Sequence, residues 1–129
     1  MIGKVYIAKL PFYNVKTQDM EFKNRPVLVI GKPDDGDYNV LPISSISVRR
    51  NVNLRYDIEI SKENYGLLKL SKDISYIRTS KSTTLNYKVL DKEVSNLKKL
   101  YPKLFELVID RFTEYTNTIQ EIALLKQKG

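Results

Sequence analysis

Two apolar runs with a polar turn between them form the clearest pattern in the chain. Residues 27–30, Val-Leu-Val-Ile, are continuously apolar and branched, which is typical of a strand buried on both faces. The segment 31–37 holds two Gly, one Pro and three Asp and predicts a turn, so that residues 38–43 return antiparallel to the first run. Arg25 precedes one strand and Ser44 ends the other. We therefore expect both side chains at the same end of the sheet.

Further strands are expected over residues 4–10, 54–60, 67–70 and 74–79. In the second of these, apolar and polar residues alternate regularly, which places one set in the core (Leu54, Tyr56, Ile58 and Ile60) and the other in water (Asn53, Arg55, Asp57 and Glu59). In the last, Arg78 shares a face with Ile74 and Tyr76. An arginine at the end of such a strand can reach a cleft.

From Asp91 the period changes to 3.6 residues, which predicts helices. Asp91 is the expected N-cap of a first helix, and Pro102 suits the first turn of a second. The second helix carries an apolar stripe at three- and four-residue spacing: Phe105, Val108, Phe112, Tyr115, Ile119 and Ile122. We expect this stripe to pack on the sheet. The alternative is that its end, residues 119–125, forms an oligomer or partner interface.

These patterns predict an α+β fold with five to seven mostly antiparallel strands, closing towards a small barrel and followed by C-terminal helices. The 129 residues, 42% hydrophobic, fit a single domain, 1–129, with the sheet in residues 1–90 and the helices in residues 91–126. No apolar run approaches the ~18 residues of a membrane span, and Lys4 and Lys9 interrupt any signal-peptide core. We therefore expect a cytoplasmic protein without a membrane partner.

Residues 11–24 show no regular period and are expected to form a long loop that includes Phe12, Tyr13 and Phe22. One interpretation is a mobile flap whose rings stack on unpaired bases while neighbouring lysines contact phosphates. The other is that the rings pin the loop to the core. We expect the second for Phe22, and both interpretations stay open for Phe12 and Tyr13.

The composition limits which catalytic groups and metal sites the chain can form. The chain contains no Cys and no His, which excludes disulfides, thiol nucleophiles and the usual zinc sites. Catalysis would have to come from Arg, Lys, Ser, Thr, Tyr or carboxylates. The one tight acidic cluster, Asp34, Asp35 and Asp37, is better explained as a solvated hairpin end, so we expect no metal site and no cofactor.

The positive charge is concentrated in the predicted sheet. The net charge is +7, and residues 1–89 carry +6 of it, with 15 Lys and Arg against 9 Asp and Glu. Such an excess suits a polyanionic partner. Arg49 and Arg50 stand side by side in an expected loop, where they contact phosphate or are simply solvated.

Four segments in this order resemble the MazF/PemK family of toxin endoribonucleases: GKVYIAKL at 3–10, NRPVLVI at 24–30, LPISS at 41–45 and YIRT at 76–79. The resemblance covers roughly residues 1–90 and implies an SH3-like barrel with a terminal helix. Two features depart from the family. Its first loop is usually rich in Gly, whereas residues 11–24 contain none, and the tail after Leu90 is longer than compact members need.

The resemblance implies a toxin of a toxin-antitoxin system that cleaves single-stranded RNA through attack of the 2′-OH. It also implies a homodimer and a cognate antitoxin, an acidic protein in preference to an RNA. Arg25 matches the family's catalytic arginine, and Ser44 matches its Thr/Ser hydroxyl. The residues expected to bind RNA are Lys23, Arg49, Arg50, Arg78, Thr79, Lys81 and Tyr13.

Two alternatives stay open. The gyrase-poisoning CcdB toxins are similar in fold and inhibit a protein target without cutting RNA. A protein of that kind would need no arginine-hydroxyl pair and would act through its terminal helix. The longer first loop and the helical tail also fit a ToxN-like ribonuclease that an RNA antitoxin neutralises.

Overall fold

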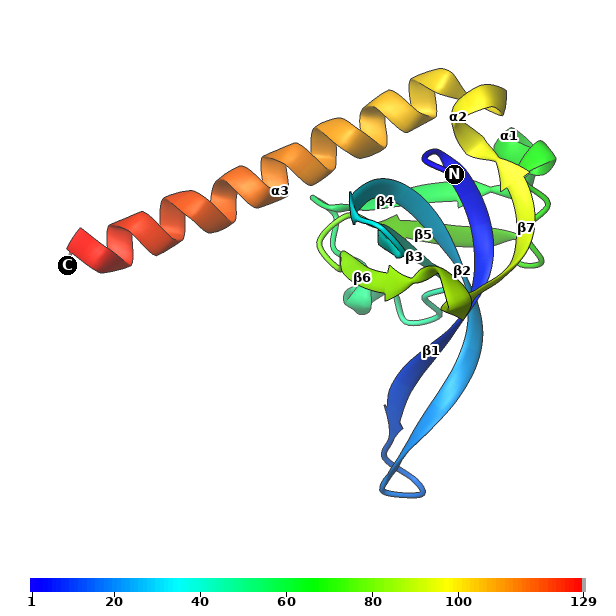
Figure 1. Cartoon of the computed structure of the whole chain (residues 1–129), viewed down its shortest axis with the longest axis horizontal. Helices are drawn as coiled ribbons and strands as arrows, with labels where there is room; N and C mark the ends of the chain where they lie inside the picture. Colours follow the sequence, from blue (N-terminus) through cyan, green and yellow to red (C-terminus); the bar gives the residue numbers. More distant parts are fainter. Residues whose placement is uncertain (129) are drawn as a thin grey trace.

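The computed structural model describes the backbone of residues 1–128 and the side chains of residues 1–125 (Figure 1). One curled, antiparallel sheet comprises β1 (Lys4–Asn14), β2 (Asp19–Asp34), β3 (Asp37–Ser44), β4 (Asp57–Ser61), β5 (Ile74–Arg78), β6 (Thr83–Asn86) and β7 (Leu90–Asn96). The helices are α1 (Lys62–Tyr65), α2 (Leu97–Leu100) and α3 (Pro102–Lys128), with 3₁₀ turns η1 (Arg49–Asn51), η2 (Gly66–Leu68) and η3 (Tyr87–Val89). The predicted α+β class, with a barrel-like antiparallel sheet and C-terminal helices, is confirmed.

The strands are hydrogen-bonded in the order β4-β5-β3-β2-β1-β7, and β6 also pairs with β3. The predicted β2–β3 hairpin is present, with Val27 opposite Pro42 and Leu28 opposite Leu41. Its turn contains Gly36 at a φ of 89°, a left-handed conformation that glycine adopts without a steric penalty. β3 pairs with β6 over Asp37–Val40 and with β5 at its other end, so the sheet divides along this strand.

β2 is buried on both faces, as predicted. Val27, Leu28 and Val29 are each 0% exposed although successive residues of a strand point to opposite faces. Leu28 belongs to the larger core, together with Leu41, Ile77, Leu97 and Val108. Val27 and Val29 belong to a second, smaller core with Ala8 and Val40.

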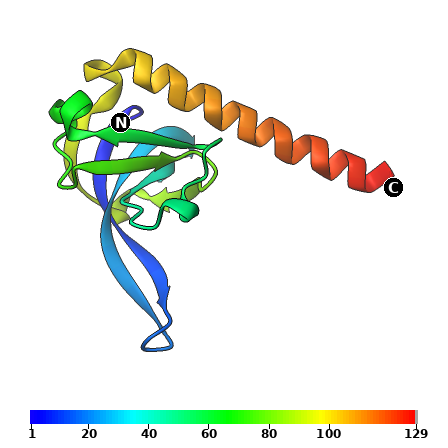
Figure 2. The same ribbon diagram turned by 180° about the vertical axis from the view of Figure 1, so that it is seen from behind.

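The prediction of a long loop over residues 11–24 is wrong. β1 and β2 continue through it as a long two-stranded hairpin that extends away from the rest of the sheet (Figures 1 and 2). The hairpin places Tyr13 opposite Met20 and Pro11 opposite Phe22. Phe22 is 63% exposed, so the expectation that it pins this segment to the core is also wrong.

The strand predicted over residues 54–60 is shorter than expected. β4 begins only at Asp57, and Leu54 lies in the preceding turn with 81% of its surface exposed. Asp57 was expected in water but is buried, because its carboxylate accepts hydrogen bonds from within the fold. The strand predicted over 67–70 is absent from this part of the chain, which forms η2 and a turn instead.

The sheet also extends further along the chain than predicted. Residues expected to begin a helix at Asp91 form β7, which pairs with β1, and the sheet ends at Asn96 in place of residue 90. Pairing with β1 satisfies the backbone N–H and C=O groups of these residues, which the sequence pattern alone predicts to be satisfied within a helix. Asn96 is the N-cap of α2, and its side chain accepts a hydrogen bond from the Lys99 N–H at 3.1 Å.

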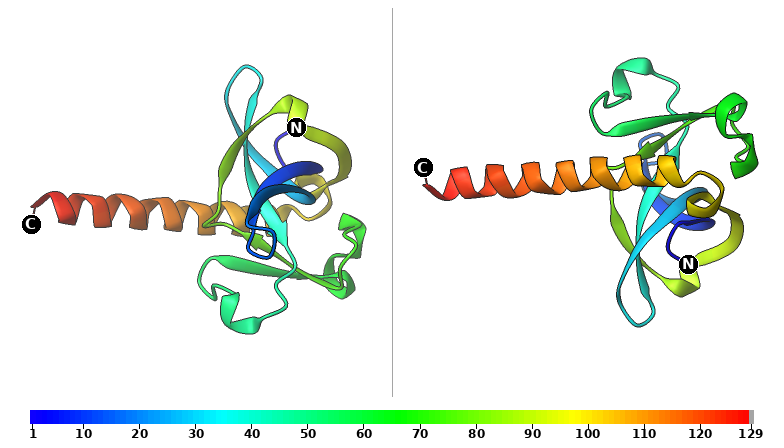
Figure 3. Two further views of the ribbon diagram at one scale, coloured as in Figure 1. Left: turned by 90° about the horizontal axis from the view of Figure 1, so that it is seen from below. Right: turned by 90° about the horizontal axis from the view of Figure 1, so that it is seen from above.

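α3 begins at Pro102 as predicted and crosses one side of the sheet before it projects beyond it (Figures 1 and 3). Its 27 residues correspond to about 40 Å of helix. Leu104, Phe105 and Val108 at its start are buried in the larger core, whereas Ile119 and Ile122 are about half exposed and Leu125 is 69% exposed. The apolar stripe therefore packs on the sheet only along its first half.

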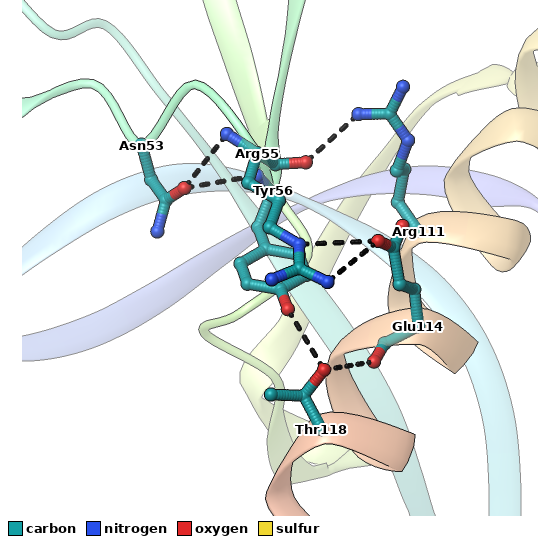
Figure 4. Close-up of polar contacts among 6 residues, drawn as sticks. All are labelled: Asn53, Arg55, Tyr56, Arg111, Glu114 and Thr118. Atoms are coloured by element: carbon teal, nitrogen blue, oxygen red, sulfur yellow. Dashed lines mark hydrogen bonds and ion pairs between the residues drawn. The ribbon is translucent and has the colours of Figure 1, made fainter.

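The middle of α3 is attached to the segment before β4 (Figure 4). Arg55 donates two hydrogen bonds to Glu114, and Arg111 donates one to the Arg55 carbonyl at 2.9 Å. The Tyr56 hydroxyl contacts the Thr118 hydroxyl at 3.3 Å, and its ring packs edge-to-face on Tyr115.

No helix in the described part of the chain is both long and apolar enough to span a membrane.

Leu97→Ala is expected to lower the free energy of unfolding by about 2–5 kcal/mol, because a fully buried side chain is lost from the larger core and leaves a cavity. Leu54→Ala removes the same atoms from an exposed turn and is expected to change stability by less than about 0.5 kcal/mol. Urea denaturation followed by circular dichroism measures both values. Equal losses in the two variants would contradict this assignment of the core.

Candidate functional site

A cleft of about 440 Å³ opens where β2 begins its buried run and β3 ends. It brings together Arg25 of β2, Ser44 of β3, Arg78 of β5 and Lys81 from the loop that follows β5. The residues that follow Ser44, 45–48, form another part of its wall. The sequence-based expectation that Arg25 and Ser44 lie at one end of the sheet is confirmed.

A smaller cleft of about 110 Å³ adjoins the first. The two share Arg25 and Ser45, so the Arg25 side chain lies between them. Lys23 lines the smaller cleft from β2, and Lys72 lines it from the loop before β5. The two clefts together form a path that passes over Arg25.

The path is positively charged. Its described lining contains no carboxylate and five cationic side chains: Lys23, Arg25, Lys72, Arg78 and Lys81. Among the side chains of residues 1–125, only Arg78 of these five takes part in an ion pair. The unpaired cations give the path a positive potential that attracts an anionic ligand.

Arg78 is held in a fixed orientation. Its Nε donates to Asp57 at 3.2 Å, and its Nη2 donates more weakly to the Asn51 carbonyl at 3.5 Å. The other Asp57 oxygen accepts from the Asn53 N–H at 2.8 Å, so a buried carboxylate is satisfied on both sides. Because Asp57 balances the Arg78 charge, Arg78 contributes N–H groups of fixed direction to the cleft and little net charge.

Arg25 and Ser44 are placed by rigid strands. Arg25 stands two residues before the fully buried Val27 and is itself partly exposed. Ser44 pairs with Tyr76 in the ladder between β3 and β5, next to the buried Ile43. Such packing fixes the backbones of the two residues relative to each other.

Tyr76 is the titratable neighbour of Ser44 in this ladder. Burial of its ring raises the pKa of Tyr76, and the nearby Glu59 carboxylate adds to the effect. The phenol therefore stays protonated at neutral pH and donates to Glu59 at 3.3 Å. Tyr76 is suited to donate a hydrogen bond and is a poor general base.

The other residues predicted to bind RNA are distributed differently. Arg49 and Arg50 are exposed on η1, beside the first cleft but outside its wall. Tyr13 is 58% exposed on the projecting hairpin. Thr79 is 0% exposed, and its hydroxyl donates to the Tyr56 carbonyl at 2.6 Å, so its side chain supports the fold and does not line either cleft.

Sequence reasoning missed two residues of this region. Lys72 reaches the path from a loop, and no local pattern distinguishes it from other surface lysines. Asp57 falls at a polar position of an alternating segment, which points to solvent, whereas it orients Arg78 from a buried position. Asn53 was a clue in the sequence, because Asn side chains often form Asx turns with the backbone N–H groups that follow them. In the structure the Asn53 side chain accepts from the Arg55 and Tyr56 N–H groups.

Within the described residues, no three His, Cys, Asp or Glu side chains gather as a group that could hold a metal ion. Comparisons with protein-family models and with curated proteins gave no match. The cationic path is therefore the feature of the molecule that indicates a function.

Proposed function

We propose that the protein is a metal-independent endoribonuclease that cleaves single-stranded RNA and acts as the toxin of a toxin-antitoxin system. The observation that carries this proposal is the joint placement of Arg25, Ser44, Arg78 and Lys81 in one cleft whose described lining has no carboxylate. The likeness of four sequence segments to the MazF/PemK family, given above, points to the same function.

The proposed reaction uses the substrate's own nucleophile. The RNA 2′-oxygen attacks the adjacent phosphorus and loses its proton to water, while the bond to the 5′-oxygen breaks and that oxygen takes a proton from water. Negative charge builds on the phosphorane oxygens during this step, and preorganised donors stabilise it. The products are a 2′,3′-cyclic phosphate and a free 5′-OH.

The two central residues fit separate roles. A guanidinium keeps its proton at neutral pH and is a poor base, so Arg25 is assigned bidentate contact with the phosphate. Ser44 is assigned a hydrogen bond to the developing charge. Arg78 and Lys81 are assigned the backbone phosphates beside the scissile one.

The partners follow from the same charge. An anionic antitoxin, an acidic protein in preference to an RNA, suits a path in which four cations have no ion pair within the described chain. We also propose a homodimer. The exposed apolar residues at the end of α3, Ile119, Ile122 and Leu125, support an interface there.

The same exposed end supports a second candidate function. A CcdB-like inhibitor would bind its protein target through terminal helix residues and would not need the cleft. The two candidates differ in which residues are essential and in what is broken in the cell.

Arg25→Ala is expected to lower RNA cleavage at least about 10²-fold and to remove toxicity, because a main donor to the transition state is lost. Arg25→Lys should restore little activity, since an ammonium cannot form the bidentate contact. Lys103→Ala is the control, because Lys103 is an exposed cation in the first turn of α3 that lines neither cleft. Gel assays with purified protein measure cleavage, and thermal unfolding checks that each variant is folded.

Induction in cells separates the two candidates. An endoribonuclease leaves discrete RNA 5′ ends, whereas a gyrase poison leaves broken DNA. A folded Arg25→Ala protein that is still fully toxic would rule out the role given to Arg25.

Cleavage is expected to persist in EDTA and to give 2′,3′-cyclic phosphate and 5′-OH ends. DNA, and RNA with a 2′-deoxy or 2′-methoxy group at the cut, should resist because they lack the nucleophile. Affinity should fall steeply with salt as phosphate contacts release counterions. Mass spectrometry of the products decides the chemistry. Metal-dependent cleavage with 5′-phosphate ends would refute the mechanism.

A synthetic peptide rich in Asp and Glu is expected to displace a fluorescent 2′-methoxy oligoribonucleotide, because both ligands need the same cations. A basic peptide of equal length is the control. Fluorescence anisotropy measures the competition, and light scattering is expected to give the mass of two chains. Simultaneous binding of acidic peptide and RNA would argue against a shared site.

A further inference from the structure

A third hollow continues the cationic path beyond the smaller cleft. It has a volume of about 420 Å³ and shares Pro26, Leu70 and Ser71 with that cleft. The smaller cleft in turn shares Arg25 and Ser45 with the first. A ligand bound at Arg25 can therefore extend into the third hollow without leaving the concave surface.

Four apolar residues line the third hollow, and together we call them its apolar floor. Ile7 and Pro26 face each other across the β1–β2 ladder, Leu70 lies in the loop before β5, and Val94 lies on β7. All four side chains are only partly buried, so each presents apolar surface to a ligand. A floor of this kind suits the flat face of an unpaired base.

Its rim is cationic. Lys69 and Lys92 line it, and neither takes part in an ion pair within residues 1–125. The one carboxylate in the described lining, Glu93, accepts hydrogen bonds from Lys4 at 2.9 Å and from the Tyr6 hydroxyl at 3.3 Å. The hydrogen bond from Lys4 lowers the pKa of the Glu93 carboxyl, so Glu93 stays ionised and its charge is balanced by Lys4.

The backbone of Lys69 has a conformation that glycine adopts more easily than lysine. It lies in the left-handed region, with φ at 60° and ψ at 33°, where it ends η2 and its N–H donates to the Gly66 carbonyl. A residue with a Cβ pays roughly 1–2 kcal/mol for this conformation, and glycine does not. Replacement of Lys69 by Gly would remove this cost and keep the turn, so Lys69→Gly is a variant that should fold.

We propose that this third hollow binds a nucleotide of the RNA strand that flanks the scissile phosphate, with its base on the apolar floor and its phosphate between Lys69 and Lys92. The proposal rests on the proposed function, because the path begins at Arg25. A single nucleic-acid strand fits better than a peptide, since it offers a flat base and a negative charge at every residue along the path.

The test compares binding of short and long strands. The probes are fluorescent, mixed-sequence 2′-methoxy oligoribonucleotides of about four and about twelve nucleotides. The variants are Lys69→Gly and Lys92→Ala, and Lys103→Ala is the control, because Lys103 is exposed in the first turn of α3 and lines none of the three hollows. Lys69→Gly also removes the backbone strain, so its Tm should equal or exceed that of the wild type.

Each variant is expected to weaken binding of the longer strand about three- to tenfold and to reduce the salt dependence by about 0.7 in log-log slope, as one phosphate contact is lost. The shorter strand and the Lys103→Ala control should be unaffected. If wild-type protein cuts RNA but both variants keep full affinity for the longer strand, this proposal is wrong and the proposed function stands. If the variants lose affinity but no RNA is ever cut, the path is supported and the nuclease assignment fails. If the wild type binds neither strand, both are wrong.

Discussion

The burial of β2 on both faces is the constraint on which the rest of the structure depends. Three consecutive residues, Val27 to Val29, are completely removed from water because one core lies on each side of the strand. A shift of one residue would exchange the contents of the two cores and would move Pro26 or Ile30, which are only partly buried, into a fully buried place, so the packing of both cores would be lost. The register against β3 is therefore fixed. Arg25 and Ser44, at the open end of this pair, inherit that fixed geometry.

Buried and exposed charges have different roles in the cleft. Asp57 is a buried carboxylate near the cleft, and both of its oxygens accept hydrogen bonds, one from Arg78 and one from the Asn53 N–H. The remaining cations of the path stand at the surface without such partners in the described chain. A buried ion pair gives directional contacts, whereas exposed cations give long-range attraction that salt screens. The site combines a rigid donor with an attractive surface.

Local patterns were sufficient where the interactions are local or where burial is complete. Residues 27–30, the turn after them and the start of α3 at Pro102 were all predictable, and so was the common position of Arg25 and Ser44. The failures concern segments whose structure depends on distant partners. Residues 90–96 are a strand because β1 is beside them, and residues 11–24 pair with each other although their side chains bury little. Lys72 and Lys69 reach the path from loops, which no periodicity locates.

The segment from Asn53 to Asp57 joins two parts of the molecule that the chain separates. Its Arg55 and Tyr56 side chains hold α3 through Glu114 and Thr118, while Asp57 holds Arg78 and the Tyr56 carbonyl accepts from Thr79. Five residues thus serve as the common support of a helix and of a cleft. Because these contacts share one short segment, we expect detachment of α3 and loss of the Arg78 orientation to occur together in local unfolding. Hydrogen exchange in the amides of this segment reports the integrity of both at once.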